Sequence, residues 1–374
     1  MQLHSESRST APADSDDRRI SLSSLGRLVS GQGLLVVILA FGLLLHLLSA
    51  DFLTPANLVN LLYQSTILGV FAIGMTFVIL TSGIDLSVGA TAGLTSVLSM
   101  GAVVRYGWPP IIGILVGLAV GLVVGLINGA MVTKLGISPL IATLATLSAT
   151  TGAAFAYSRG SNITPVPQML QDAVNAKILG IPVMIPAVLL LAVIAHSLLT
   201  RTTYGRSIYA VGGNPEAALL AGIRVARVKL AAYAICGVTA AVAGIMLTGR
   251  LASGSPRAGD GIELTVIAAV VIGGTSLFGG QGNIRGTMLG VLLISMVSNA
   301  VNLLGVPSSY DQIVQGVVIF AAAALDVYRS RYLQRGLSRK AAIPPPTGTS
   351  PDNDPAPELA PTGPSADATE GPRR

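Results

Sequence analysis

Ten long apolar runs, separated by short polar segments, make up most of the chain. They lie at residues 34–50, 58–80, 88–104, 109–132, 139–156, 182–199, 230–248, 264–278, 286–304 and 312–327. A helix needs about 20 apolar residues to cross a bilayer, and two of these runs are short. The pattern predicts an all-α polytopic membrane protein with about ten transmembrane helices.

Composition supports this fold class. Hydrophobic residues are 51% of the sequence and charged residues 11%, and the mean hydropathy is +0.70. The 43 glycines suit membrane helices, which pack closely where side chains are small. The single cysteine, Cys236, permits no internal disulfide and no thiolate metal cluster. We therefore expect no metal and no cofactor.

Both ends of the chain differ from the middle. Residues 1–30 and 331–374 are polar, the second being rich in proline, and neither has the apolar residues that a core requires. We interpret both as disordered tails that flank a membrane domain at 31–330.

The basic residues predict the orientation. With ten spans, both termini share one side of the membrane, and a cytoplasmic amino terminus places eighteen Lys and Arg residues inside and five outside. Positive charge marks cytoplasmic segments. The net charge of +6 is thus explained by topology, and we expect no nucleic-acid partner.

The most polar internal segment, residues 200–229, contains a short predicted helix at 215–221. Asn214 can cap it, Pro215 suits its first position, and Glu216 complements the helix dipole. Gly222 can take the left-handed conformation that ends it. Two turns are too short for stability in water alone. The helix is either a plug for another protein's groove or an interfacial helix on lipid headgroups.

Two glycine-rich breaks, residues 81–89 and 273–282, each follow one apolar run and precede another. Irregular backbone at membrane depth must be buried in protein or line a wet cavity. The corresponding positions of the breaks predict an internal repeat around a pathway. The alternative is that both are tight turns between spans.

The sequence carries no signature of an enzyme. The three histidines have no metal-ligand spacing, and the glycines near residue 279 lack the lysine of a phosphate loop. Neither acidic nor basic residues lie near the middle of a predicted span, which disfavours an ion-coupled carrier. Gln64, Asn128 and Asn299 are the best candidates to line a path for a polar solute. Asp85 either lines it or holds the backbone of the first break.

Four strings together resemble the ribose-type permeases of bacterial ATP-binding-cassette sugar importers. They are SGIDLSVG at 82–89, SPLIATL at 138–144, YGR to AGI across 204–223, and GGTSLFGG at 273–280. The resemblance runs from about residue 52 to 328. It implies a bacterial inner-membrane subunit with cytoplasmic termini, paired as a homodimer. Its other partners would be a cytoplasmic ATPase and a periplasmic or lipid-tethered sugar-binding protein.

In that family, the counterpart of 212–222 engages the ATPase. The resemblance therefore assigns a coupling role to Gly212, Gly213, Asn214, Pro215, Glu216, Ala217 and Gly222. The expected function is import of a monosaccharide of the ribose, xylose or galactose type, with ATP hydrolysed on the partner chain. The alternatives are a permease for a branched-chain amino acid, nucleoside or other polyol, an ion-coupled secondary carrier, and a passive pore.

Overall fold

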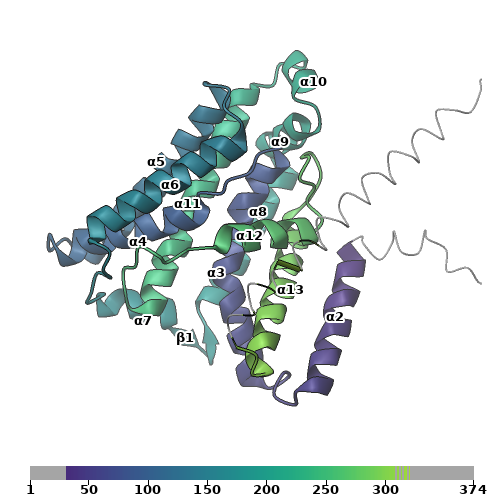
Figure 1. Cartoon of the computed structure of the whole chain (residues 1–374). Helices are drawn as coiled ribbons and strands as arrows, with labels where there is room; N and C mark the ends of the chain where they lie inside the picture. The colour runs from purple at the N-terminus through teal and green to yellow at the C-terminus, as the bar shows by residue number, and fades with distance from the viewer. Residues whose placement is uncertain (1–30, 308–309, 311–312, 314–315, 318–319, 321–374) are drawn as a thin grey trace, which may run out of the picture. The chain divides into compact units, whose positions relative to one another are not determined.

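The computed structural model describes residues 31–307, 310, 313, 316–317 and 320, and these are mostly helical (Figure 1). The helices are α2 (Gly31–Leu48), α3 (Pro55–Leu80), α4 (Val88–Val104), α5 (Pro110–Thr133), α6 (Pro139–Ser158), α7 (Gln168–Asn175), α8 (Met184–Arg201), α9 (Thr203–Gly213), α10 (Pro215–Leu220), α11 (Val225–Leu251), α12 (Ile262–Ile272) and α13 (Ile284–Leu303). Two short antiparallel strands, β1 (Lys177–Ile178) and β2 (Ile181–Pro182), form a hairpin before α8.

Among the residues that the structure describes, six helices are long and apolar enough to cross a membrane: α3, α5, α6, α8, α11 and α13. Three shorter apolar helices, α2, α4 and α12, coincide with three more of the predicted runs. The tenth run, at 312–327, falls mostly outside the described residues, as do both predicted tails. Ten spans therefore stay a prediction, while a mostly helical chain with six candidate spans is established.

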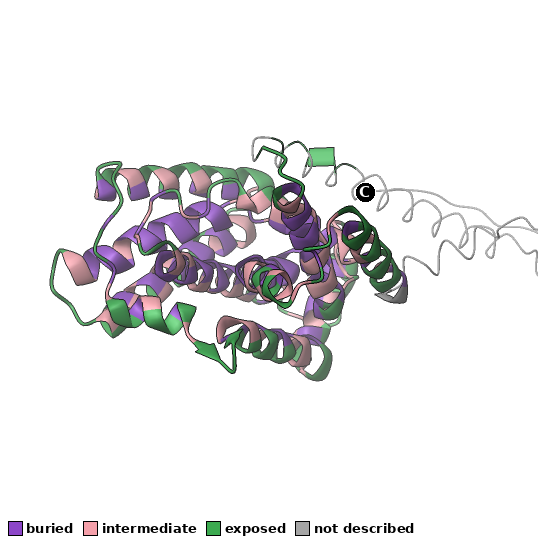
Figure 2. Cartoon of the chain, turned by 90° about the horizontal axis from the view of Figure 1, so that it is seen from below, coloured by how far each residue is buried: buried purple, intermediate pink, exposed green. Residues whose placement is uncertain are grey.

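Helix α3 is the centre of the packing. All of its residues from Ser65 to Leu80 are buried, and it contacts α8, α11, α12 and α13. A helix that is apolar on every side lies either in a protein core or in a bilayer, and the burial of α3 by its neighbours places it in the core. Figure 2 shows buried residues where the helices face one another and exposed residues along the outer sides of peripheral helices.

Helix α5 packs against its neighbours through a row of buried glycines, one every fourth residue. They are Gly113, Gly117, Gly121, Gly125 and Gly129. A Cβ atom added at Gly121 would collide with the carbonyl oxygen of Gly237 on α11, and one at Gly237 with that of Gly121. The two backbones are in direct contact, as small residues permit in membrane helices.

Three features were not predicted from the sequence. Helix α9, helix α7 and the β1–β2 hairpin lie in segments without long apolar runs, which carry no signal of a membrane span. The run at 264–278 is also shorter as a helix, because α12 ends at Ile272. Gly274 then has a φ of 90°, a conformation that leaves the helix and favours glycine.

Candidate functional site

The predicted short helix exists as α10, one residue shorter than expected. The Asn214 side chain accepts a hydrogen bond from the Ala217 N–H at 3.0 Å, and Pro215 occupies the first turn. Gly222 has a φ of 80°, and the Ile223 N–H donates to the Ala218 carbonyl oxygen at 3.0 Å. Cap and left-handed stop are both confirmed, because each depends only on local geometry.

The outer face of α10 carries two large apolar side chains. Leu219 is 64% exposed and Leu220 is 90% exposed, while Ala218 is buried on the opposite face. Burial of a leucine side chain contributes about 1.5–3 kcal/mol, so two leucines left open on a capped helix favour a contact outside the chain.

Helix α9 holds α10 against the rest of the chain. Thr202 caps α9 by accepting from the Gly205 N–H at 3.1 Å. The Tyr204 hydroxyl donates to the Val228 carbonyl oxygen at 3.3 Å, and the Tyr209 hydroxyl to that of Gly282 at 2.9 Å. Burial raises the pKa of the Tyr209 phenol, so this donor keeps its proton at physiological pH. Helix α9 is thereby attached to α11 and to the second break.

Both glycine-rich breaks meet the end of α9. The Gly280 N–H donates to the carbonyl oxygen of Leu80 at 3.0 Å, which joins the second break to the last residue of α3, directly before the first break. The Ser82 hydroxyl lies 3.1 Å from the Gly212 carbonyl oxygen and 2.7 Å from that of Phe278. We call this contact between residues 80–82, 212–213 and 278–280 the three-segment junction. The sequence contains its three strings but shows no sign that they touch.

Gly212 is required at the junction because nothing larger fits. A Cβ atom added there would overlap the Leu80 carbonyl oxygen and lie 2.5 Å from the Gly280 nitrogen. Gly213, by contrast, has open space around its Cβ position. Gly212 and Gly213, the two glycines before Asn214, are both predicted to have a coupling role. Only Gly212 has surroundings that exclude a larger side chain.

Asp85 and Asn128 form one buried polar cluster. Asp85 Oδ1 accepts from the Ser87 N–H at 2.9 Å and from the Ser87 hydroxyl at 2.6 Å. Asn128 Nδ2 lies 2.8 Å from Ser87 Oγ and 3.3 Å from both carboxylate oxygens. Both side chains are buried. The cluster fastens the first break to α5, which is the structural role considered for Asp85.

The other two path candidates lie elsewhere. Asn299 of α13 exchanges two hydrogen bonds with Asn57 of α3, at 3.1 Å and 2.8 Å between amide nitrogen and oxygen. Gln64 is half-buried on α3. The four residues predicted to line a path therefore do not form one site, and their role in transport stays a prediction.

The Asn57–Asn299 pair gives a stability prediction. Asn57→Leu removes both of these hydrogen bonds, together with the one from Asn57 Nδ2 to the Phe52 carbonyl oxygen at 2.9 Å, and leaves the buried Asn299 amide unpaired, at a cost of about 1–3 kcal/mol. The double variant Asn57→Leu/Asn299→Leu should recover part of the loss, because no amide is then unpaired, although the Phe52 carbonyl oxygen still lacks its partner. Thermal unfolding can be followed by thiol labelling of Cys236, the sole cysteine, which is buried. Asn60→Leu, at an exposed position on the same helix, is the control. Equal midpoint temperatures of thermal unfolding for all variants would contradict the prediction.

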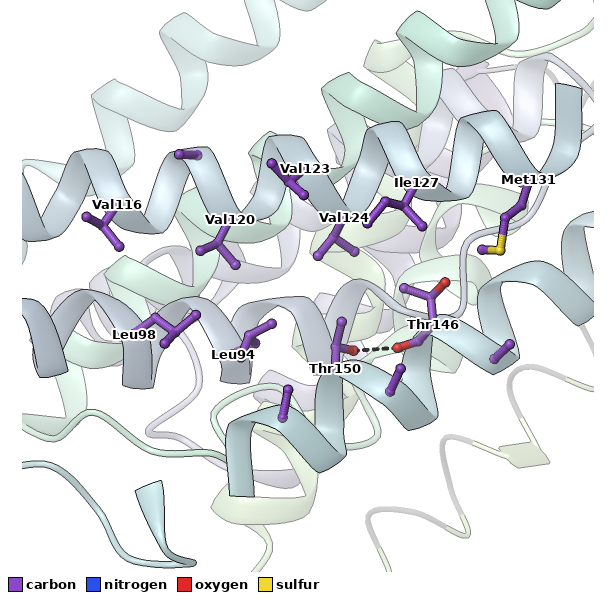
Figure 3. Close-up of a pocket in the computed structure, with 14 residues that line it drawn as sticks. Leu94, Leu98, Val116, Val120, Val123, Val124, Ile127, Met131, Thr146 and Thr150 are labelled. Atoms are coloured by element: carbon purple, nitrogen blue, oxygen red, sulfur yellow. Dashed lines mark hydrogen bonds between the residues drawn. The ribbon is translucent and has the colours of Figure 1, made fainter. Parts of the chain in front are cut away.

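A groove of about 700 Å³ runs between α4, α5 and α6 (Figure 3). Apart from the hydroxyls of Thr146 and Thr150, its lining side chains are apolar. Both hydroxyls donate to carbonyl oxygens of their own helix, at 3.1 Å and 2.7 Å. A groove without free donors suits hydrocarbon and does not suit a polar solute.

Comparison with known proteins identifies similar chains. Residues 57–323 match the family model described as branched-chain amino acid transport system / permease component. A ribose import permease protein of Bacillus subtilis (strain 168) is 49% identical over 290 residues, 77% of this chain and 90% of that protein. An L-arabinose ABC transporter permease protein of Azospirillum brasilense is 36% identical over 303 residues, 81% of this chain and 89% of that protein. A fructose import permease protein of Rhizobium meliloti is 37% identical over 310 residues, 78% of this chain and 83% of that protein. No solved structure is significantly similar to this chain.

Proposed function

Since the chain belongs to the family of branched-chain amino acid transport system permease components, we propose that it is the permease subunit of an importer driven by an ATP-binding-cassette ATPase. The solute is a monosaccharide of the ribose, xylose or galactose type. The observation that carries this proposal is the 49% identity to a ribose import permease over nine tenths of that protein's length. Two further relatives are named for arabinose and fructose. The family description supports a second candidate, import of a branched-chain amino acid.

The chain is a transport component, and ATP is hydrolysed on a partner chain. We assign the ATPase contact to the segment from Gly212 to Gly222, with Gly213, Asn214, Pro215, Glu216 and Ala217. Support comes from α10, which is capped at both ends and carries two exposed leucines. A rigid short helix can enter a groove as one unit.

We place the protein in the bacterial inner membrane as a multi-pass chain with both termini in the cytoplasm. The six candidate spans support a multi-pass chain. The orientation rests on the five basic residues from Arg201 to Lys229, which lie within α9 or close to α9 and α10. The permease domain extends over residues 31–330, and the segments before and after it are tails.

A second copy of the chain completes the path in this proposal, and α6 is the helix that supports it. Helices α5, α6 and α8 are each 28% buried over their most apolar window. The exposed faces of α5 and α8 consist mainly of leucine, isoleucine and valine, as expected of a face against lipid. That of α6 carries Leu140, Ile141 and Leu144 in its first two turns and small residues beyond them, with Ala145, Ala149 and Ala153 lining the groove and Ser148 and Gly152 outside its lining. Small residues favour contact between helices over contact with lipid.

The remaining partners follow from the same class of importer. A periplasmic or lipid-tethered sugar-binding protein selects the solute outside. Within the path, Gln64 is proposed to contact the solute, while Asp85, Asn128 and Asn299 act by fixing the helices around it. Alternating access would then arise from tilting of helices when α10 moves.

The proposal is tested by uptake into vesicles. The chain is reconstituted with its cognate ATPase and binding protein, and labelled ribose, xylose, galactose and leucine are offered with and without ATP inside. We expect ATP-dependent uptake of one of the sugars only when the ATPase is present. Uptake of leucine alone would favour the second candidate. Accumulation by the purified chain under an ion gradient would contradict an ATP-driven importer.

Gly222→Val tests whether the shape of α10 matters. Valine at a φ of 80° is strained, because its branched Cβ opposes the left-handed conformation. The helix then loses its stop, and we expect uptake to fall about tenfold, the effect of roughly 1.4 kcal/mol, with normal membrane insertion. Ala226→Val, an exposed position on the first turn of α11, is the control. Full uptake by Gly222→Val would reject the coupling role.

A further inference from the structure

Ser82 occupies an unusual position at the three-segment junction. Its φ is 60°, the left-handed region that favours glycine, although it is not a glycine. A glycine would adopt this conformation with less strain but would lack the hydroxyl. The hydroxyl reaches carbonyl oxygens 130 and 196 residues away in the sequence.

A serine hydroxyl has one proton and can donate it to one strong acceptor at a time. Here two acceptors lie within reach, the Gly212 carbonyl oxygen at 3.1 Å and the Phe278 carbonyl oxygen at 2.7 Å. Gly212 is the penultimate residue of α9, two positions before the Asn214 cap of α10, and Phe278 lies in the second break. The proton can therefore bond to either segment, or be shared by both.

The glycines packed against Ser82 and Gly213 have no space for a side chain. A Cβ atom at Gly279 would collide with Ser82 Oγ, and one at Gly280 would lie 2.8 Å from the Gly213 nitrogen. The Gly280 N–H is meanwhile bonded to Leu80. Closely packed segments move together or repack, because such contacts do not deform gradually. Displacement of Gly212 must therefore be passed to the end of α3 and to residues 278–280 of the second break.

We propose that Ser82 is a positioning residue that transmits movement of α10 to both breaks by holding Gly212 and Phe278 with one hydroxyl. This inference rests on the proposed function, since α10 moves only if an ATPase acts on it. It deepens that function by naming the link between the motor contact and the membrane helices.

The experiment compares Ser82→Gly and Ser82→Ala with the wild-type complex of permease, ATPase and binding protein in proteoliposomes. The readout is sugar transported per ATP hydrolysed, together with co-purification of the ATPase. We expect this ratio to fall about five- to tenfold in both variants, within the usual range of coupling between sites. ATPase association should be unchanged. Thr133→Val is the control, because it removes a hydroxyl that donates to the Gly129 carbonyl oxygen within α5.

A ratio that is unchanged in Ser82→Gly overturns the proposal. Loss of ATPase association in both variants also overturns it, because the hydroxyl would then only maintain the shape of the docking segment. Ser82→Gly relieves the strain and Ser82→Ala retains it, so a loss common to both is due to the missing hydroxyl.

A second measurement does not depend on transport. Hydrogen exchange of the peptide that contains Gly279 and Gly280 is followed in the purified chain. Ser82→Gly should accelerate this exchange, and Thr133→Val should not. If the wild-type complex shows no ATP-dependent uptake, the proposed function fails, and the exchange result still decides on the link. Equal protection in Ser82→Gly and wild type overturns it, and lost protection supports it.

Discussion

Gly121→Leu is expected to remove most of the folded protein from the membrane. The position has no room for a Cβ atom, because the Gly237 carbonyl oxygen and the Ala241 methyl group of α11 occupy that space. A leucine would push α5 and α11 apart along their full contact, since neighbouring glycines on α5 approach the same helix. Overpacking costs about 1–3 kcal/mol and occasionally more. Here it acts on backbone, which cannot change rotamer, so we expect the upper end or beyond.

The measurement is the amount of monodisperse protein after extraction, with the labelling rate of the buried Cys236 thiol as a report of folding. Ala119→Leu is the matched control. It adds a leucine two residues away on the same helix, at an exposed position beside the groove in Figure 3. Equal yields of the two variants would show that α5 and α11 are not packed through their glycines.

The membrane helices could be predicted well because their signal is local. Nine of the ten apolar runs coincide with helices, and the comparisons confirm the resemblance to ribose-type permeases. The α10 cap was also predictable, since Asn214, Pro215 and Gly222 act within nine residues. The prediction of the helices depends on the length of apolar runs, and that of the cap depends on the conformation of a few adjacent residues. Neither prediction requires knowledge of contacts between distant parts of the chain.

The three-segment junction could not be predicted because it depends on contacts between distant parts of the chain. Nothing near Ser82 in the sequence indicates that its hydroxyl reaches Gly212 and Phe278. The same holds for Asn299: its polar side chain within an apolar run predicts a path-lining role, and nothing near it in the sequence indicates that it pairs with Asn57. A polar residue in a membrane helix has the same sequence signature in either role. Helix α9 was a different case, because Thr202 and the spacing of Tyr204, Ile208 and Val211 were available as signals.

The largest functional effect is expected from Leu219→Ser/Leu220→Ser. Both side chains project from α10 and contribute little to the fold, so the variant should fold and insert normally. If α10 enters a groove of the ATPase, the two leucines become buried there, at about 1.5–3 kcal/mol each. Their loss should weaken the permease–ATPase complex by ~100-fold or more, since each 1.4 kcal/mol is a factor of ten. Binding of the ATPase to nanodiscs that contain the permease measures this directly.

Leu179→Ser separates a specific contact from a general effect of exposed leucines. Leu179 is 97% exposed at the tip of the β1–β2 hairpin, and the proposed topology places that hairpin on the periplasmic side. The same substitution there should leave ATPase binding unchanged, because the ATPase cannot reach it. If Leu179→Ser weakened ATPase binding while Leu219→Ser/Leu220→Ser did not, the orientation would be reversed and α10 would face outward. The pair of variants therefore tests the motor contact and the topology together, since a cytoplasmic ATPase can dock only on the side that carries α10.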